Sequence, residues 1–435
     1  MDTQGTEKMF VEDGSIDAKW LTKLCLECGA DDAGFVQIER SELDPERDRI
    51  LSAFPWTKTL IGIVCRMNRE PIRTPMRSVA NTEFHHVGNH VNEVCHKIVR
   101  SLESHKFRAA NPALGFPMEM DNFGSEQTWV ISHKRVAEAA GLGKMGIHRN
   151  IIHPRFGSFV LLGTVATDAK VNQYSDALNY TPCVTCKLCV AACPTGAIAS
   201  DGYFNFSACY THNYREFMSG FTSWVENIVT SKNAEEYRAK VSDSESASMW
   251  QSLSYGANYK AAYCIAVCPA GEEVIQPFQQ NRAEYLKNIV KPLQDKAEIV
   301  FVVGDSDAEA HVQQRFPNKK TKRVSNGFRP ATIRAFLQGL LVAFQRRQSK
   351  GMNATYHFTF TGAETVDATV SIHDQELQVS EGHQGKPHLH VIADSNTWLR
   401  FLRKEIGILP ALFKRKIKLR GSPMLMRQFA KCFPS

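Results

Sequence analysis

The residues of this chain best suited to chemistry are cysteines at a fixed spacing near its middle. They form the segment Cys183-Val-Thr-Cys186-Lys-Leu-Cys189-Val-Ala-Ala-Cys193-Pro194. This is the C-x2-C-x2-C-x3-C-P pattern by which bacterial ferredoxins hold iron–sulfur clusters. Thiolates are soft ligands that suit iron, whereas four cysteines at this spacing before a proline fit a zinc site poorly. The segment therefore predicts an iron–sulfur protein.

A second half-motif, Cys264-Ile-Ala-Val-Cys268-Pro269, repeats the end of that pattern. In two-cluster ferredoxins the fourth cysteine of one motif serves the other cluster. On this logic the predicted ligands of the first cluster are Cys183, Cys186, Cys189 and Cys268, and those of the second are Cys193, Cys209 and Cys264.

One ligand of the second cluster is missing from the sequence. A regular motif would place a cysteine at position 261, where this chain has Ala261. Three alternatives stay open: a three-iron cluster, a four-iron cluster with a ligand other than cysteine, and an engineered deletion of the ligand. The five other cysteines are expected to be core thiols; they are Cys25, Cys28, Cys65, Cys95 and Cys432.

Composition limits the class of protein. A chain of 435 residues suggests roughly three domains of about 150 residues each. It is 43% hydrophobic and 22% charged, as in ordinary globular proteins, and it has no apolar stretch long enough to cross a membrane. The start of the chain does not resemble a signal peptide. We therefore expect a cytoplasmic protein whose twelve cysteines are thiols or metal ligands rather than disulfides.

The net charge of +7 is concentrated at the C-terminal end. Residues 401–435 contain nine Lys or Arg and one Glu, so the rest of the chain is nearly neutral. Within residues 414–420 basic and apolar side chains alternate, which predicts a half-buried strand with a basic outer face. That face is either simply solvated or contacts anionic lipid or another acidic partner.

Hydrophobic periodicity divides the chain into parts of different class. Helical patterns at residues 17–29 and 89–106, with short apolar segments at 59–65 and 158–165, predict an α/β domain. Loop-like stretches separate the cysteines, and residues 318–326 resemble a linker. A helix at 330–347 is followed by strand patterns at 355–360, 365–372 and 376–380. The predicted domains are 1–174 (α/β), 175–290 (two-cluster, ferredoxin-like), 291–327 (connecting segment) and 328–435 (α+β).

A glycine motif, Gly141-Leu-Gly143-Lys-Met-Gly146, matches the dinucleotide-binding pattern G-x-G-x-x-G. In a dinucleotide site this motif leaves a strand and opens a helix, but here it follows the helical segment 132–140. The motif therefore favours a close approach of the backbone to another flat or anionic cofactor, or a purely structural turn.

Residues 133–146 and 150–168, followed by the cysteine motif, resemble the corrinoid and iron–sulfur reductases, which include epoxyqueuosine reductases and respiratory reductive dehalogenases. The resemblance covers roughly residues 15–290. It implies an N-terminal domain that holds base-off cobalamin and two cubane clusters that supply it with electrons. It would place five residues close to the corrin: Gly141, Gly143, Gly146, Gly157 and Ser158. The proton donor of epoxyqueuosine reductases is an acid upstream of this segment, which makes Asp121 and Glu126 candidates, with His133 as a further one.

The C-terminal residues 354–362, 367–372, 394–398 and 416–423 resemble a lipid-binding domain of the sterol-carrier-protein type. This resemblance implies an antiparallel sheet covered by helices over an apolar tunnel, with a lipid or acyl chain as ligand. Epoxyqueuosine reductases instead end in a helical-repeat region for tRNA, which we do not find here. From this difference we expect that tRNA is not a partner.

The expected function is therefore an enzyme, a cobalamin-dependent iron–sulfur reductase. It would act on a small substrate, apolar if the C-terminal domain binds it, and take electrons from a ferredoxin- or flavodoxin-type partner. Two other functions stay open: a ferredoxin-type electron-transfer protein without catalysis of its own, and a lipid-binding redox adaptor.

Overall fold

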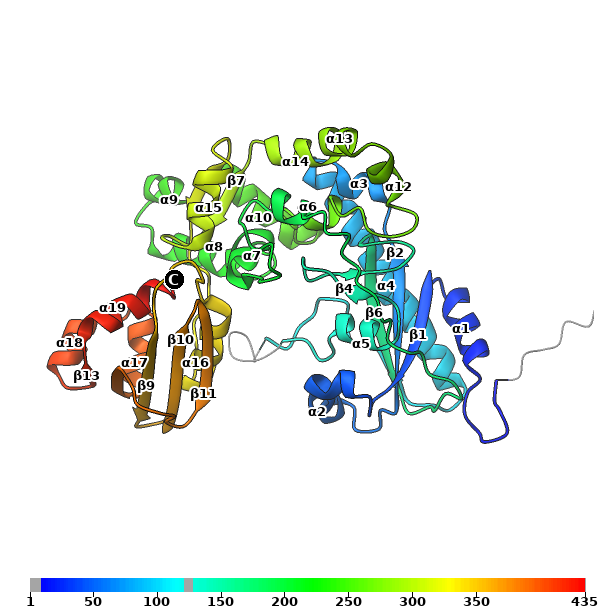
Figure 1. Cartoon of the computed structure of the whole chain (residues 1–435), viewed down its shortest axis with the longest axis horizontal. Helices are drawn as coiled ribbons and strands as arrows, with labels where there is room; N and C mark the ends of the chain where they lie inside the picture. The colour runs from blue at the N-terminus through cyan, green and yellow to red at the C-terminus, as the bar shows by residue number, and fades with distance from the viewer. Residues whose placement is uncertain (1–8, 121–127, 435) are drawn as a thin grey trace, which may run out of the picture.

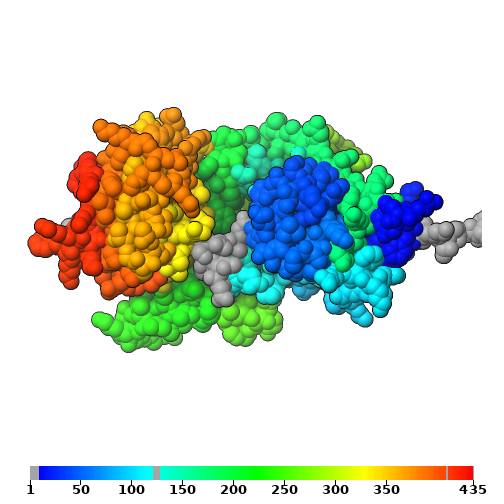
Figure 2. Space-filling view, turned by 90° about the horizontal axis from the view of Figure 1, so that it is seen from below, coloured from blue at the N-terminus to red at the C-terminus, as the bar shows by residue number. Residues whose placement is uncertain are grey.

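The structure, a computed structural model, describes residues 9–120 and 128–434. The chain forms an arch: the N-terminal sheet lies at one end, the cysteine-bearing helices span the top, and a second sheet lies at the other end (Figure 1). Seen from below, the N-terminal residues in blue and the C-terminal residues in orange and red occupy opposite halves of the longest axis (Figure 2). Within the described ranges, no helix is both long and apolar enough to cross a bilayer.

The N-terminal sheet is buried on both faces. Its strands, in the order β1-β2-β6-β3, are β1 (Asp32–Gln37), β2 (Thr59–Arg66), β6 (Val160–Thr167) and β3 (Ala109–Ala110). The helices and short turns around it are α1 (Ala18–Glu27), η1 (Ser41–Leu43), α2 (Asp44–Ala53), α3 (Arg69–Arg73), α4 (Arg77–Ser104) and α5 (His133–Ala139). The predicted mixture of helices and buried strands is confirmed. All the strand pairs are antiparallel, however, so this is not the parallel sheet of a doubly wound domain.

Short helices dominate the segment that carries the cysteines. They are α6 (Leu188–Ala192), α7 (Phe206–Asn213), α8 (Ser219–Thr230), α9 (Ala234–Lys240), α10 (Asp243–Tyr255), α11 (Tyr263–Ala266), α12 (Gln276–Gln280), α13 (Arg282–Tyr285), η3 (Leu286–Val290) and α14 (Lys291–Asp295). The expectation of loop-like stretches was wrong for residues 219–255. Two helix starts could have been found in the sequence, because Asn233 and Ser242 each cap the amide of a glutamate three residues later.

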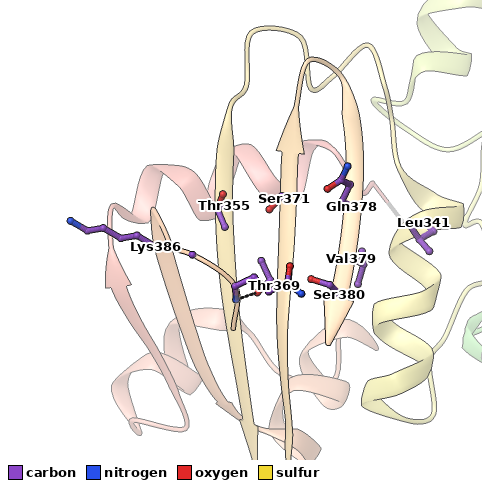
Figure 3. A pocket seen from close by; sticks show the side chains of 10 residues that line it. Leu341, Thr355, Thr369, Ser371, Gln378, Val379, Ser380 and Lys386 are labelled. Atoms are coloured by element: carbon purple, nitrogen blue, oxygen red, sulfur yellow. Dashed lines mark hydrogen bonds between the residues drawn. The ribbon is translucent and has the colours of Figure 1, made fainter. Parts of the chain in front are cut away.

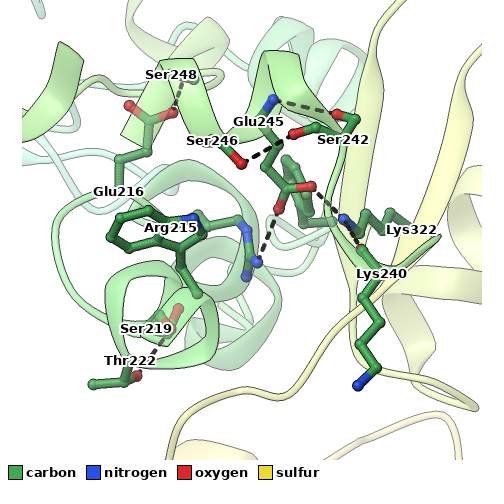
Figure 4. A network of polar contacts seen from close by, with 12 residues as sticks. Arg215, Glu216, Ser219, Thr222, Lys240, Ser242, Glu245, Ser246, Ser248 and Lys322 are labelled. Carbon is green, nitrogen blue, oxygen red and sulfur yellow. Dashed lines mark hydrogen bonds and ion pairs between the residues drawn. The ribbon is translucent and has the colours of Figure 1, made fainter. Parts of the chain in front are cut away.

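Buried charged side chains stabilise the helical segment 219–255, which we call the helical insert (Figure 4). Glu216, which is 7% exposed, accepts hydrogen bonds from Ser248 Oγ at 2.6 Å and from Ser252, and it forms an ion pair with Lys260. Glu245 contacts the Arg215 guanidinium at 3.4 Å. It also pairs with Lys322, which belongs to a strand far along the chain, so the insert is tied to the following segment.

That following segment is a small parallel unit rather than a linker. Strands β7 (Ile299–Val302) and β8 (Lys320–Arg323) pair in parallel, and α15 (Asp307–Arg315) connects them. The prediction of a linker at residues 318–326 was therefore wrong, because the polar sequence Lys320-Thr-Lys-Arg323 forms a strand with mostly exposed side chains.

A five-stranded sheet with helices on one side forms the C-terminal part. Its order is β11-β10-β9-β12-β13: β11 (Glu376–Glu381), β10 (Val366–His373), β9 (Ala354–Thr361), β12 (Leu389–Asp394) and β13 (Ile417–Gly421). Its helices are α16 (Ile333–Ala343), α17 (Ser395–Leu402), α18 (Ile408–Phe413) and α19 (Pro423–Lys431). Aromatic rings pack between the sheet and the helices. The ring centroid of Phe336 lies 5.5 Å from that of Trp398 and 6.0 Å from that of Phe358. The predicted strands at 355–360, 365–372 and 376–380 are confirmed, as is the basic strand, where Ile417 is buried.

Candidate functional site

The two cysteine motifs fold into the same local structure. Lys187 and Ala262 both adopt left-handed backbone conformations, with φ values of 54° and 55°, and each directly precedes a short helix. Cys189 and Cys264 are each the second residue of these helices, α6 and α11, which pack against one another. The segment thus contains a local repeat, and its two copies bring the motifs together.

The seven predicted ligand cysteines lie near one another on α6, α7, α11 and the residues beside them. We keep the two predicted ligand sets as the first group (Cys183, Cys186, Cys189 and Cys268) and the second group (Cys193, Cys209 and Cys264). Charge interactions run both within and between these groups, because Cys264 is a neighbour of Cys189 and of Cys268. Burial raises the pKa of the Cys264 thiol to about 12, and the neighbouring Cys193 adds to the effect. Burial also raises the pKa of Cys268, to about 11. The assignment of these thiols as ligands stays a prediction.

The described residues contain no compact donor set for a single metal ion. Among residues 9–120 and 128–434, no three His, Cys, Asp or Glu side chains converge as they would around one metal ion. An iron–sulfur cubane takes one thiolate per iron, so its ligands stand apart from one another at the corners of the cluster. Thiols without disulfide partners, which describes all twelve cysteines here, are the form that can bind it.

Ala261 occupies the position in the second motif that Cys186 has in the first. Each lies three residues before the helix cysteine and directly before the left-handed residue. Ala261 is 5% exposed, and its amide donates a hydrogen bond of 2.9 Å to Asn213 Oδ1. The backbone of a ligand position is therefore retained without its thiol.

Replacing Ala261 with cysteine is expected to give the second cluster a fourth thiolate. An added thiolate makes a cluster more negative, which lowers its reduction potential. The potential can be measured by a redox titration followed by electron paramagnetic resonance. Ala262→Cys, one residue further along, is the control and should leave the signal unchanged. An unchanged potential in Ala261→Cys would show that position 261 does not face the cluster.

A half-buried lysine and an amide lie beside the second cysteine group. Lys134 Nζ donates hydrogen bonds to the carbonyl oxygen of Arg149 at 2.6 Å and to Asn150 Oδ1 at 3.2 Å. Asn150 Nδ2 in turn lies 3.8 Å from Cys264 Sγ, within the range of a hydrogen bond to sulfur. Positive charge and N–H donors near the sulfur atoms favour the reduced, more negative state of a cluster. No sequence pattern pointed to Asn150, because α5 and the 147–150 turn meet only in the fold.

Of the three predicted proton donors, His133 lies within the described residues and two do not. Asp121 and Glu126 lie outside the described residues, so their role stays a prediction. The His133 ring has a polar partner at each nitrogen: Nδ1 lies 2.9 Å from Thr164 Oγ1, and Nε2 lies 3.1 Å from the Ala113 carbonyl oxygen. Burial lowers the pKa of His133. Both ring nitrogens are thus engaged within the protein, which gives His133 a structural role here.

Most of the residues predicted to approach a corrin make close contacts with other parts of the protein. A Cβ on Gly141 would lie 2.5 Å from the Asp176 carbonyl oxygen, and one on Gly157 would lie 2.0 Å from that of Ala270. A Cβ on Gly143 would likewise come too close to the Ile152 carbonyl oxygen. The Ser158 hydroxyl is buried and donates to the Ile265 carbonyl oxygen at 3.1 Å.

Gly146 differs from these residues, because its Cβ position faces the side chains of Ile152 and His148. The other four positions are explained by close packing of the chain on itself. Their approach to a corrin stays a prediction.

Comparison with known proteins places these features in two families. Residues 177–199 match a 4Fe-4S binding domain, and residues 340–434 match the SCP-2 sterol transfer family. Over 181 residues, 42% of this chain, the sequence is 26% identical to an epoxyqueuosine reductase of Gloeobacter violaceus. The chain is similar to epoxyqueuosine reductases in part of its length and to the SCP-2 sterol transfer family over residues 340–434. The resemblance found in the sequence is thereby confirmed.

Other matches agree with this placement. An epoxyqueuosine reductase of Synechocystis is 27% identical over 215 residues, 49% of this chain. A solved epoxyqueuosine reductase that contains a tRNA-Tyr stem loop has 16% sequence identity and a TM-score of 0.34, and the match covers 75% of this chain and 84% of that one. The chain spans 54% of the Gloeobacter enzyme and 61% of the Synechocystis enzyme.

One expectation is overturned by these relatives. The lack of a helical-repeat tail led us to expect that tRNA is not a partner. The relatives are epoxyqueuosine reductases, and one of them has been solved with an epoxyqueuosine-modified tRNA stem loop. The expectation was wrong because the lack of one RNA-binding region was taken as the lack of an RNA partner.

Proposed function

We propose that this chain is an iron–sulfur reductase that acts on a modified nucleoside carried by tRNA. The observation that carries the proposal is the local repeat of α6 and α11, because it packs the helices that carry Cys189 and Cys264 against one another. The class of substrate is proposed from the relatives, which are named for the reduction of epoxyqueuosine.

Electrons would pass from the first cluster to the second. Cys189 of the first group and Cys264 of the second are neighbours, so two clusters bound there would be close together. Lys134 and Asn150 would favour the reduced state of the second cluster, which makes it the electron acceptor of the pair.

Cobalamin belongs to the proposal through the family resemblance. When bound, a corrinoid supplies a strongly nucleophilic metal centre for reductive chemistry. No contact with this chain is assigned to it, because four of the five predicted corrin-facing positions pack against the protein. The lipid or acyl ligand of the C-terminal domain likewise stays a proposal, supported by the match to the SCP-2 sterol transfer family.

The proposal can be tested on the full chain, purified without oxygen in the presence of hydroxocobalamin. Iron, sulfide and cobalt are measured first, and then the holoprotein is incubated with a reductant and tRNA containing epoxyqueuosine. We expect two clusters per chain and conversion of the nucleoside, detected by mass spectrometry of the digested tRNA. Cys193→Ala, which removes a predicted ligand of the second cluster, should abolish conversion.

Each failure has a separate meaning. Fully loaded clusters without conversion, under conditions in which an epoxyqueuosine reductase converts the same tRNA, would contradict the substrate. Conversion without retained cobalt would contradict the cobalamin requirement. Electron transfer to an artificial acceptor without any conversion would instead favour the ferredoxin-type function.

A further inference from the structure

The C-terminal sheet has a polar face opposite its aromatic core. Side chains alternate along each strand, so the buried Tyr356, Phe358 and Phe360 of β9 face the helices, and the residues between them face away. The strand register aligns one row of outward residues across all five strands: Ser380, Thr369, His357, His390 and Arg420. We call this surface the outer face.

A groove of about 690 Å³ lies on the outer face over β9, β10 and β11 (Figure 3). Leu341 and Val379 supply apolar lining, and hydroxyl and amide groups supply most of the rest, from Thr355, Thr369, Ser371, Gln378, Ser380 and Gln384. Lys386 stands at its rim, and its side chain extends away from the groove in Figure 3. Hydroxyls, amides and lysines are the groups that contact ribose and phosphate in nucleic-acid complexes.

Three imidazole rings adjoin the groove. His357 and His383 are stacked, with ring centroids 4.3 Å apart and planes inclined by 5°, and His383 lies 5.1 Å from His390. Thr359 Oγ1 lies 3.2 Å from His383 Nε2 and 2.9 Å from His390 Nε2, which holds the two rings in place. Histidine rings are among the side chains on which RNA-binding proteins stack unpaired bases.

Cations continue the outer face on the edge strand. Lys418 pairs with Ile392 and Arg420 with His390, so both basic side chains point to the same side as the imidazoles. They are exposed, and within the described residues neither of them forms a salt bridge. The register also places three acids on this side: Asp367, which lies 3.4 Å from His383 Nε2, Glu376, which is opposite His373, and Asp394, which is opposite Thr361. None of them forms a salt bridge with Lys418 or Arg420 within the described residues.

We propose that the outer face is an RNA-binding surface. The groove offers contacts to sugar and phosphate, and Lys418 and Arg420 offer phosphate charge pairing. The rings of His383 and His390 offer stacking, whereas His357 is buried beneath His383. The proposal rests on the proposed function for the choice of tRNA, and it supplies the RNA contact that a helical-repeat tail would otherwise make. A membrane fits this face less well, because the exposed Phe413 belongs to α18 rather than to the outer face.

The test compares two double variants of the full chain that lose the same charge. Lys418→Gln/Arg420→Gln removes the cations of the outer face, and Arg427→Gln/Lys431→Gln removes two exposed cations of α19 on the helix side. Binding of a fluorescent tRNA stem loop is measured by anisotropy at several salt concentrations. We expect the first variant to bind more weakly and to lose about two units of salt slope, and the control to bind like the wild type.

Two results would overturn the proposal. Equal weakening in both variants would indicate diffuse attraction by the whole basic end, and no weakening in either would exclude the face. If the protein instead binds phosphatidylserine-containing vesicles but no RNA, and Phe413→Ser abolishes that binding, the basic end is a membrane surface. The binding test does not depend on turnover, so it can be carried out even if the protein fails to convert tRNA. If conversion is normal and RNA binding is unchanged in the first variant, the outer face is refuted and the proposed function is not.

Discussion

Replacing Cys268 with alanine is expected to remove the first cluster and to spare the second. Cys268 lies with Cys183, Cys186 and Cys189, whereas the second group draws on α7 and α11. Loss of a thiolate ligand leaves one iron of a cubane without its protein anchor. Iron and acid-labile sulfide per chain should fall to about half of the wild-type values, and the spectrum of the reduced protein should keep one cluster signal.

Cys432→Ala is the matched control for this experiment. Cys432 is also fully buried, but it packs in the C-terminal domain, with its sulfur 3.7 Å from Met352 Sδ. Iron content should not change in that variant. Retention of both clusters in Cys268→Ala would show that the ligands are not exchanged between the motifs in the predicted way.

Replacing Lys260 with methionine is expected to destabilise the helical insert strongly. Its ammonium is the cationic partner of Glu216, whose side chain is almost completely buried. Removing one member of a buried ion pair leaves the other charge without compensation, which costs about 3–5 kcal/mol. The midpoint of thermal unfolding, followed by circular dichroism, should fall accordingly.

Lys240→Met is the control for this variant, because Lys240 pairs with Glu236 at 2.9 Å on the surface of α9. Exposed pairs of this kind contribute only about 0.3–0.5 kcal/mol. A similar loss of stability in both variants would contradict the role assigned to the buried pair.

The same pair gives the protein a defined response to acid. Burial acts to raise the pKa of Glu216, but the charge of Lys260 and hydrogen bonds from serine hydroxyls outweigh it, so the pKa is lowered from the ordinary 4.5. A lowered pKa means that the stabilisation is present above the unfolded value and is lost as pH falls through the folded value. In Lys260→Met the charge that lowers the pKa of Glu216 is lost and only hydrogen bonds oppose burial, so the acid-induced loss of stability from this group should be smaller than in the wild type.

The cluster site could be predicted from the sequence because its information is local. Spacing alone identified the cysteines, and the absence of a cysteine at Ala261 was visible before the structure showed that the residue occupies the position of Cys186 in the other motif. The buried strands β2 and β6 were equally visible as apolar segments.

Other features depend on pairings between distant segments, and no local pattern carries them. The row from Ser380 to Arg420 exists only through the register of five strands. The sequence likewise could not show that carbonyl groups from other parts of the chain crowd the Cβ positions of Gly141, Gly143 and Gly157. The linker prediction failed for the same reason, since β8 is stabilised by pairing with β7.

The small β7-α15-β8 unit has a mechanical consequence. Asp307 at the start of α15 accepts a hydrogen bond of 2.8 Å from the Arg347 amide and donates its own amide to Gln345 at 3.0 Å. Arg346 pairs with Asp201 at 2.5 Å, and the Tyr210 ring stacks on Phe328 at 5.1 Å. These contacts fix the last hundred residues against the cysteine-bearing helices. A ligand bound by that part of the chain would therefore be held in a fixed orientation and at a fixed distance from those helices.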